Sequence, residues 1–343
     1  MAKIFVTRQI PGKALEELAK THEVVVSPFD RPLAADEIVE MGKGAEAALT
    51  LLTERWTGEL MDQMGPNLKI ISNYAVGFDN IDVKAATERG ILVCNTPSDE
   101  VNEAVAEFTW ALILSLSRRV VESSEFADKG AYRGWEPHIF LGRDVYSKTL
   151  GIIGLGRIGS MVARRAKGFN MRVVYYNRDK DTDEEKELGV EYLDLDSLLG
   201  QSDIVSLHVP LTSETRHLIN KDSIAKMKNG AYLINTSRGP IIDEHAVVDA
   251  LRSGKLGGVG LDVHENEPAT NPEMMQMENA ILTPHIASAT VEAREKMTQQ
   301  AVDAIVKVLS GEKPNDLVNP EAWLSKRIQA TDSSSRIAVA QAQ

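Results

Sequence analysis

The sequence is short of cysteine and of long apolar runs. Cys94 is the only cysteine among 343 residues, so the chain can form neither an internal disulfide nor a cysteine metal site, and we expect no metal. This composition fits a reducing compartment, and we expect a cytoplasmic protein. The most apolar segment, "VAEFTWALILSLS" at 105–117, is too short for a bilayer and contains Glu107. The first residues also lack the cationic and apolar segments of a signal peptide.

Positive charge is scarce as well. Lysine and arginine together number 38 against 50 acidic residues, which gives a formal net charge of −12. A surface of this sign repels nucleic acid and acidic membranes, so we expect no nucleic-acid partner and no membrane association. Hydrophobic residues make up 43% and charged residues 26% of the chain, which is typical of a globular protein. At about 100–200 residues per domain, the length predicts two domains.

The chain does have a regular alternation of short apolar, β-branched runs with helical patterns. Runs such as "KIFVT" and "EVVVS" begin the first series, and "KTLGIIG" begins a second. This alternation predicts an α/β fold with parallel sheets covered by helices on both faces. A long apolar helix at about 102–122 interrupts the rhythm and could cross between two domains. The small, polar tail at 329–343 is expected to be disordered.

A glycine-rich turn lies between an apolar strand and a helix at the start of the second series. Gly154 would permit the tight turn, Gly156 would let the backbone approach a pyrophosphate, and Gly159 would let the helix pack on the strand. The unpaired N–H groups of the helix would then bind the anion. Glycine-rich turns are common, but the flanking strand and helix favour a dinucleotide site. The residues expected to contact the cofactor here are Gly154, Leu155, Gly156, Arg157, Ile158 and Gly159.

The end of the next strand bears on the choice of cofactor. An NAD enzyme carries an acidic residue there for the adenosine ribose, but this chain has Asn177 followed by Arg178. Arginine can bind a 2′-phosphate through charge-assisted hydrogen bonds. Asp179 would restore an NAD interpretation after a slip of register, and Arg178 could instead be a solvated loop charge. We expect NADP(H) to be preferred, with NAD(H) possible.

Three chemically capable residues follow predicted strands of the second series: Arg238, Glu267 and His285. Since ligands collect at the carboxyl ends of parallel strands, these side chains should face the same crevice as the glycine turn. Each has a plain structural alternative, as a surface ion pair, a turn carboxylate or a helix cap. Together they predict a hydride-transfer site. Arg238 would bind a carboxylate, His285 would donate a proton, Glu267 would orient the imidazole, and a nicotinamide would supply the hydride.

Four ordered motifs carry a resemblance to a known family. "GIIGLGRIG", "LINTSRGPIID", "GVGLDVHENEP" and "LTPHIASAT" resemble the D-isomer-specific 2-hydroxyacid dehydrogenases over about residues 1–320. "YAVGFDNID", "VAEFTWALIL" and "GWEPHIFLG" look most like the glyoxylate/hydroxypyruvate reductases in that family. The resemblance implies a flavodoxin-like substrate domain at 1–98 and 291–328. A Rossmann-type coenzyme domain at 99–290 would be inserted in it.

The resemblance also implies roles for individual residues. Arg238 would bind the substrate carboxylate and carbonyl, Glu267 would pair with the histidine, and His285 would be the acid–base group. Backbone N–H groups of Val76 and Gly77 would hold the carboxylate, and Leu52 would line the pocket. Further cofactor contacts are implied at Asn177, Arg178, Asp179, Val209, Pro210, Thr236, Ser237, Arg238, Asp262, His285, Ile286 and Ala287. Family members usually form homodimers, and Trp135 would either reach the neighbour's pocket or pack in the interface.

The function expected from these residues is NAD(P)H-dependent reduction of small 2-keto acids, with glyoxylate and hydroxypyruvate first. D-Lactate, D-glycerate or phosphite dehydrogenase on the same machinery is the alternative within the class. A different class is also open, because some proteins of this fold act as dinucleotide-sensing corepressor scaffolds. Turnover separates the two classes, since a scaffold should oxidise NADPH negligibly with any small keto acid.

Overall fold

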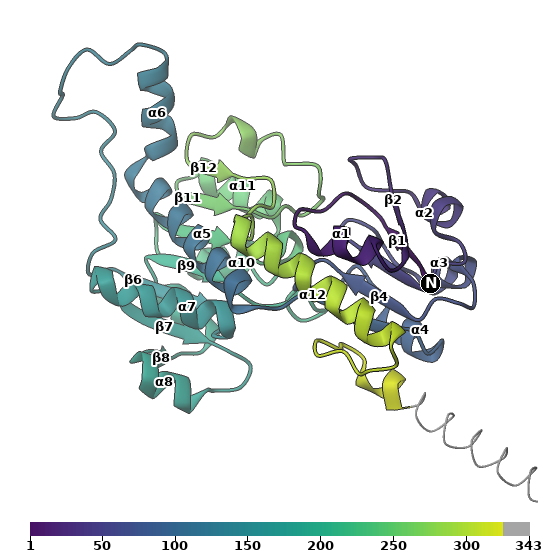
Figure 1. Ribbon diagram of the computed structural model, residues 1–343. Coiled ribbons are helices and arrows are strands. Elements are labelled where there is room, and N and C mark those ends of the chain that lie inside the picture. The colour runs from purple at the N-terminus through teal and green to yellow at the C-terminus, as the bar shows by residue number, and fades with distance from the viewer. Residues whose placement is uncertain (325–343) are drawn as a thin grey trace, which may run out of the picture. The chain divides into compact units, whose positions relative to one another are not determined.

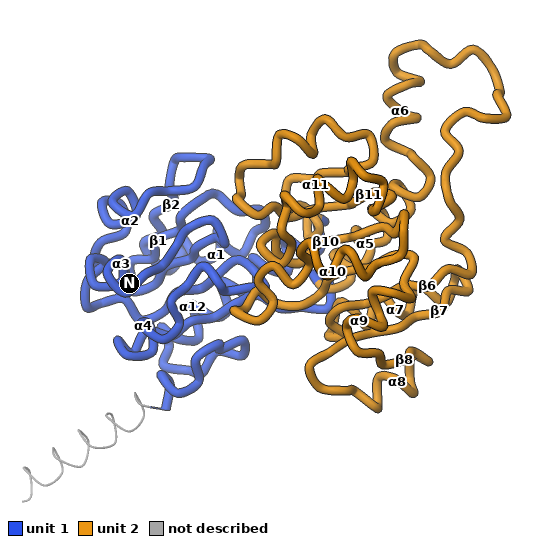
Figure 2. The backbone as a smooth tube through the Cα atoms, turned by 180° about the vertical axis from the view of Figure 1, so that it is seen from behind, with its two compact units in different colours: residues 1–101, 290–343 blue, residues 102–289 orange. Residues whose placement is uncertain are grey.

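The computed structural model describes residues 1–324, and the chain divides into two compact units. Unit 1 combines Met1–Val101 with the chain from Thr290 onward, and unit 2 is Asn102–Ala289 (Figure 2). The tail expected to be disordered, 329–343, lies outside the described residues. No helix among residues 1–324 is long and apolar enough to cross a membrane.

In the described part of the chain, unit 1 is built on a five-stranded parallel sheet in the order β2-β1-β3-β4-β5. The strands are β1 (Lys3–Val6), β2 (Glu23–Val26), β3 (Ala47–Thr50), β4 (Ile70–Asn73) and β5 (Leu92–Cys94). Every residue of β3 and β4 is buried, as expected when helices cover both faces of a parallel sheet. The chain winds first to one side of β1 and then to the other, which is the flavodoxin-like arrangement.

The helices of unit 1 come from both ends of the sequence. They are α1 (Ala14–Ala19), α2 (Ala35–Gly42), α3 (Gly58–Met64), α4 (Val83–Glu88) and α12 (Val291–Leu309). The long helix α12 packs on α1 and β4 (Figure 1). Hydrogen bonds join it to β4 and the residue after it, including those from Ser72 Oγ to the Ala301 carbonyl at 3.0 Å and from the Tyr74 hydroxyl to the Arg294 carbonyl at 2.8 Å. The distant segment therefore completes this unit.

Unit 2 contains a seven-stranded parallel sheet in the order β12-β11-β10-β9-β6-β7-β8. The strands are β6 (Thr149–Ile153), β7 (Arg172–Tyr176), β8 (Glu191–Tyr192), β9 (Ile204–Leu207), β10 (Ala231–Asn235), β11 (Leu256–Leu261) and β12 (Ala280–Leu282). The direction of winding reverses between β6 and β9, which is the Rossmann arrangement with one further strand. Both units are therefore doubly wound parallel sheets, and the fold class expected from the sequence is confirmed.

Helices cover both faces of this second sheet (Figure 1). They are α5 (Asp99–Arg118), α7 (Arg157–Ala166), α8 (Thr182–Leu188), α9 (Leu195–Gln201), α10 (Lys221–Lys226) and α11 (Glu244–Arg252). A further helix, α6 (Val120–Asp128), projects away from the sheet (Figure 1). The single helix expected at about 102–122 is in fact two helices, because Arg119 adopts a left-handed conformation with φ +53° between α5 and α6. The boundary between the two units lies within α5.

Candidate active site

Different steric conditions explain why glycine stands at each of the three positions after β6. A Cβ on Gly154, whose φ is +102°, would lie 2.7 Å from the His208 carbonyl, and a Cβ on Gly159 would lie 2.1 Å from the Gly154 oxygen. Packing within the chain therefore requires glycine at both positions. A Cβ on Gly156 would meet nothing within 4 Å. This open space in front of the turn is what a bound pyrophosphate needs.

The helix behind the turn begins without a side-chain cap. Gly156 is the N-cap of α7, and among residues 1–324 no side chain accepts a hydrogen bond from the first turn of this helix. The unpaired N–H groups and the positive end of the helix dipole are therefore available to an anion. Arg157, in the first turn and exposed, adds a positive charge there. The turn and helix together fit a dinucleotide phosphate.

Of the three residues that follow β7, Asn177 is hydrogen-bonded to the glycine turn, whereas Arg178 and Asp179 are exposed. The Asn177 side-chain oxygen accepts a hydrogen bond from the Leu155 N–H at 2.7 Å, so this amide holds the glycine turn against β7. The Arg178 side chain is 95% exposed and that of Asp179 is 88% exposed, with 3.5 Å between Nε and Oδ2. The Arg178 guanidinium thus extends into solvent just beyond the glycine turn.

Glu267 and His285 form a hydrogen-bonded pair. His285 Nδ1 lies 2.9 Å from Glu267 Oε2, and the other carboxylate oxygen accepts a hydrogen bond from the His264 N–H at 3.0 Å. Burial raises the pKa of the Glu267 carboxyl, but the His285 contact and the His264 N–H outweigh it and hold the pKa below its ordinary value. Among residues 1–324, no side chain hydrogen-bonds Nε2 of His285, so this nitrogen is available to a substrate.

A buried carboxylate, Asp262, holds the loop that carries His285. His285 has φ +56°, a conformation that costs a non-glycine residue about 1–2 kcal/mol. The fully buried Asp262 accepts hydrogen bonds from the Ile286 N–H at 2.9 Å and the Ala287 N–H at 2.7 Å. The Thr283 hydroxyl donates to it at 2.7 Å. Asp262, Ile286 and Ala287 are thus occupied with one another, and Asp262 fixes the histidine loop in its unusual conformation.

Arg238 lies three residues beyond the end of β10, in a turn that is held by hydrogen bonds of the Asn235 side chain. The Asn235 side chain donates to the Arg238 carbonyl at 2.8 Å and accepts from the Ser237 N–H at 3.0 Å. Arg238 is half-buried, and its Nη1 donates to the Ser237 carbonyl at 2.8 Å. The Ser237 hydroxyl donates to the Val209 carbonyl, which joins this turn to the loop after β9. Thr236 Oγ1 lies 2.9 Å from the Thr109 hydroxyl of α5.

The loops carrying Arg238 and Glu267 are in direct contact. A Cβ on Gly239 would lie 1.9 Å from the His264 carbonyl oxygen, so the two backbones touch. The strands β10, β11 and β12 are neighbours in the sheet, and Arg238, Glu267 and His285 follow them in that order. The structure therefore places all three residues at one edge of unit 2. Val209 and Pro210 follow β9, the next strand along, and the glycine turn follows β6 beyond it.

In unit 1, the residues expected at the substrate carboxylate lie after β4. The Asn73 side chain donates to the Gly77 carbonyl at 2.8 Å, and the Asn95 side chain donates to the Val76 carbonyl at 2.7 Å. The carbonyl groups are therefore held in place. The N–H groups of Val76 and Gly77 donate to no partner among the described residues, which leaves both free for an anion.

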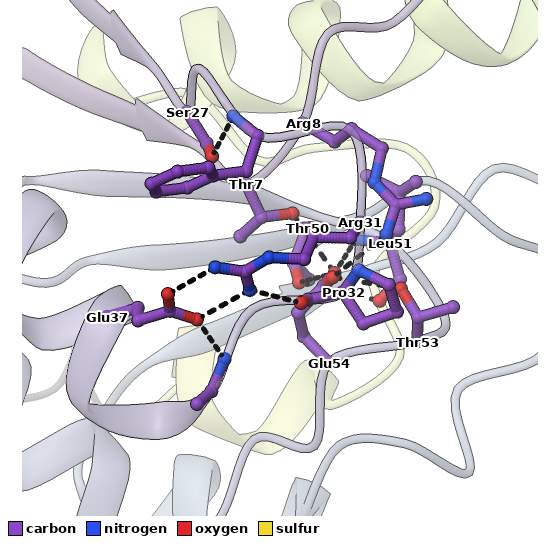
Figure 3. Close-up of polar contacts among 12 residues, drawn as sticks. Thr7, Arg8, Ser27, Arg31, Pro32, Glu37, Thr50, Leu51, Thr53 and Glu54 are labelled. Carbon is purple, nitrogen blue, oxygen red and sulfur yellow. Dashed lines mark hydrogen bonds and ion pairs between the residues drawn. The ribbon is translucent and has the colours of Figure 1, made fainter.

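The turn after β3, which carries Leu52, is held by a second buried carboxylate (Figure 3). The Glu54 side chain has no exposed surface, and Arg8 Nη2 lies 3.9 Å from its Oε1. Hydrogen bonds to this carboxylate come from the Leu51 N–H and the hydroxyls of Thr7, Thr50 and Thr53. Leu52 itself is half-buried. Sequence reasoning missed Arg8 and Glu54, although polar residues just beyond two neighbouring strands gave a signal.

Comparisons with known proteins agree with this geometry. The model of the D-isomer specific 2-hydroxyacid dehydrogenase NAD binding domain matches residues 110–287. A glyoxylate reductase of Thermococcus kodakarensis is 45% identical over 323 residues, covering 93% of this chain and 96% of the relative. The chain belongs to the D-isomer-specific 2-hydroxyacid dehydrogenase family.

Solved structures are also similar to this dehydrogenase in sequence and in fold. The TT0316 protein from Thermus thermophilus is 42% identical with a TM-score of 0.86, covering 92% of this chain and 99% of that one. An NADPH-dependent glyoxylate/hydroxypyruvate reductase from Sinorhizobium meliloti is 30% identical with a TM-score of 0.81, covering 94% and 99%. The protein is therefore an oxidoreductase that interconverts keto acids and hydroxy acids and uses a nicotinamide dinucleotide.

The arm of the dehydrogenase between α6 and β6 carries Trp135. Its side chain is 83% exposed, and Tyr132, Leu141 and Tyr146 near it in the sequence are 64%, 65% and 62% exposed. α6 and the chain after it project away from the sheet of unit 2 (Figure 1).

Proposed function

We propose that this dehydrogenase reduces small 2-keto acids to 2-hydroxy acids, with glyoxylate and hydroxypyruvate as its first substrates. The observation that carries the proposal is the His285–Glu267 pair beside the Arg238 turn, with Nε2 of the imidazole unengaged. The names of its relatives from Thermococcus kodakarensis and Sinorhizobium meliloti support these two acids. D-Lactate, D-glycerate or phosphite would use the same groups.

The proposed mechanism assigns one task to each group. The Arg238 guanidinium binds the substrate carboxylate and carbonyl, because its planar fork matches two oxygens. By the family resemblance, the N–H groups of Val76 and Gly77 would hold the carboxylate and Leu52 would line the pocket. His285 donates its Nε2 proton to the carbonyl oxygen as that atom becomes a hydroxyl. Glu267 stays ionised and stabilises the imidazolium. When bound, the dihydronicotinamide supplies the hydride to the carbonyl carbon.

We propose that NADP(H) is preferred and that NAD(H) is accepted. No acidic side chain directly follows β7, and the exposed Arg178 guanidinium is the group that would bind a 2′-phosphate. The NADPH-dependent relative from Sinorhizobium meliloti supports this preference. Unit 2 would be the coenzyme domain and unit 1 the substrate domain. Further cofactor contacts are proposed at Asp179, Val209, Pro210, Thr236, Ser237, Asp262, Ile286 and Ala287.

We also propose a homodimer formed through α6 and the arm. Val120, Val121 and Trp135 are exposed, and a hollow of about 450 Å³ is lined by residues that include Val121, Phe126 and Met275. Exposed apolar surface of this kind marks interaction sites. In a dimer, Trp135 would reach the neighbour's pocket or pack in the interface.

A panel of 2-keto acids assayed with NADPH and NADH side by side tests the function. We expect the highest kcat/KM for glyoxylate or hydroxypyruvate with NADPH. A clear preference for pyruvate would move the assignment to D-lactate within the same class. Negligible oxidation of both cofactors with every acid would refute the proposed reductase function and favour a dinucleotide-sensing corepressor scaffold.

A further inference from the structure

The loop that carries Glu267 contains a second carboxylate, Glu265, which the proposed mechanism does not use. Its side chain is 15% exposed. His217 Nε2 lies 2.6 Å from Glu265 Oε1, and Arg216 Nη2 lies 3.8 Å from the same oxygen. A largely buried carboxylate needs such partners, because desolvation penalises an unpaired charge. Glu265 is therefore anchored to the loop between β9 and α10.

Glu265 also exchanges hydrogen bonds with Glu244, the first residue of α11. The Glu265 N–H donates to Glu244 Oε1 at 2.8 Å, and the Glu244 N–H donates to Glu265 Oε2 at 3.3 Å. Glu244 is itself 5% exposed. The positive end of the α11 dipole and the Arg216 guanidinium offset the like charge of the two carboxylates. We call His217, Glu244 and Glu265 the Glu265 cluster.

His217 connects this cluster to the loop that carries Arg238. Its N–H donates to the Pro240 carbonyl at 2.9 Å, and the Ile219 N–H donates to the Ile241 carbonyl at 3.1 Å. Pro240 lies two residues beyond Arg238. His217 has φ +50°, a region that few non-glycine residues occupy and that persists only where the surroundings enforce it.

The backbone of His264 connects the Glu265 cluster to both proposed catalytic groups. Its carbonyl oxygen packs against Gly239, next to Arg238, and its N–H donates to Glu267. Glu265 follows His264 directly in the chain. A shift of Glu265 must therefore change the spacing between the Arg238 turn and the Glu267–His285 pair.

We propose that His217 and Glu265 are positioning residues, which hold the Glu267 loop against the Arg238 loop and so fix the distance between the carboxylate-binding group and the proton donor. The inference rests on the function proposed above. A misplacement of about 1 Å can cost about 100-fold in rate, so loss of the contact should lower kcat/KM for glyoxylate by roughly tenfold. The glycine turn shares no hydrogen bond with the cluster within residues 1–324, so NADPH affinity should be unchanged.

Two substitutions of His217 separate positioning from packing. His217→Gln keeps an N–H donor where Nε2 stood, whereas His217→Leu keeps the volume and removes the donor. In the full-length protein, we would measure kcat and KM for glyoxylate and the NADPH Kd by fluorescence titration. We expect His217→Leu to lose roughly tenfold, mainly in kcat, and His217→Gln to stay near the parent. His245→Leu, at an exposed histidine of α11, is the control and should match the parent.

Equal losses in His217→Leu and His217→Gln, no loss in either, or a parallel loss of NADPH affinity would overturn the proposal. If His217→Leu does not fold, His217→Ala, Glu265→Gln and their combination take its place. The double variant should lose no more activity than the more impaired single variant, because both changes remove one contact; additive losses would overturn the proposal. A parent protein that does not reduce glyoxylate would refute the proposed function instead, before any variant is compared.

Discussion

Replacing Glu267 with glutamine removes the negative charge beside His285 but keeps a side chain of nearly the same shape. The Nδ1–Oε2 distance is 2.9 Å, and the His285 and Glu267 side chains are 26% and 32% exposed. Two unit charges about 4 Å apart attract by about 1 kcal/mol in water and by about 4 kcal/mol at an effective dielectric of 20. Partial exposure places this pair between those limits, at about 1–2 kcal/mol, which corresponds to about one pH unit.

The sign of the effect follows from the role of the proton. Reduction needs a protonated imidazole, and the negative charge of the Glu267 carboxylate stabilises that form. The alkaline limb of the kcat/KM profile for glyoxylate should therefore move to lower pH by about one unit in Glu267→Gln. Steady-state rates with NADPH across the range in which histidine titrates provide the measurement. Glu273→Gln, at a surface carboxylate of the same unit, is the control. An alkaline limb that stays in place would refute the orienting role of Glu267.

The same variant has a second, independent readout in stability. Burial raises the pKa of the Glu267 carboxyl, but the His285 contact and the His264 N–H lower it by more than burial raises it. The pKa of Glu267 is therefore below its ordinary value. A depressed carboxyl pKa contributes stability above the ordinary value of about 4.3 and loses it as pH falls through the folded value. The difference in urea midpoint between the parent and Glu267→Gln should thus be greatest above about pH 4.5 and shrink below it.

Three further substitutions test separate parts of the proposal. Arg178→Ala should raise the NADPH Kd about tenfold and leave that of NADH nearly unchanged, because only NADPH offers a 2′-phosphate; equal losses in a fluorescence titration would remove this assignment. Arg238→Ala should raise KM for glyoxylate and lower kcat, for a loss of about 100-fold in kcat/KM, and a value near the parent's would contradict the carboxylate role. Glu54→Ala should lower the free energy of urea unfolding by about 3 kcal/mol, since it leaves the half-buried Arg8 without its counter-ion and the Thr7 and Leu51 donors without their acceptor. Glu46→Ala, in an exposed pair, should lose less than about 1 kcal/mol, and equal losses would contradict the burial argument.

The sequence was sufficient where local sterics or strand order decide the structure. Gly154 and Gly159 could be predicted because a strand, turn and helix of this kind leave no room for a Cβ at either position. Arg238, Glu267 and His285 could be placed at one edge because three successive strands, each followed by a crossover, add side by side to a parallel sheet. These predictions depend on periodicity and topology, which a single sequence contains.

The sequence was insufficient where a polar group's partner is set by tertiary packing. Asp262 was expected to contact the cofactor, and the sequence did not indicate that its oxygens accept hydrogen bonds from the Ile286 and Ala287 N–H groups. Asn177 was counted toward the ribose, yet its side chain also holds the glycine turn. The break between α5 and α6 falls at Arg119, where no glycine or proline marks it. In each case the side chain type is compatible with several partners, and only the folded chain selects one.

The side chain proposed to set cofactor preference, Arg178, is much less constrained by its contacts than the proposed proton donor, His285. His285 is fixed by the Asp262 network and by Glu267, so a substitution in that set disturbs several hydrogen bonds at once. Arg178 is 95% exposed, and its contact with Asp179 spans neighbouring residues in solvent, so replacing it should cost little folding stability. If binding of the 2′-phosphate depends on this one side chain, then Arg178→Asp should reverse the preference toward NADH while leaving the alkaline limb of the glyoxylate profile where it is in the parent. A movement of that limb together with the cofactor preference would show that the two functions are coupled, contrary to the separation seen in their contacts.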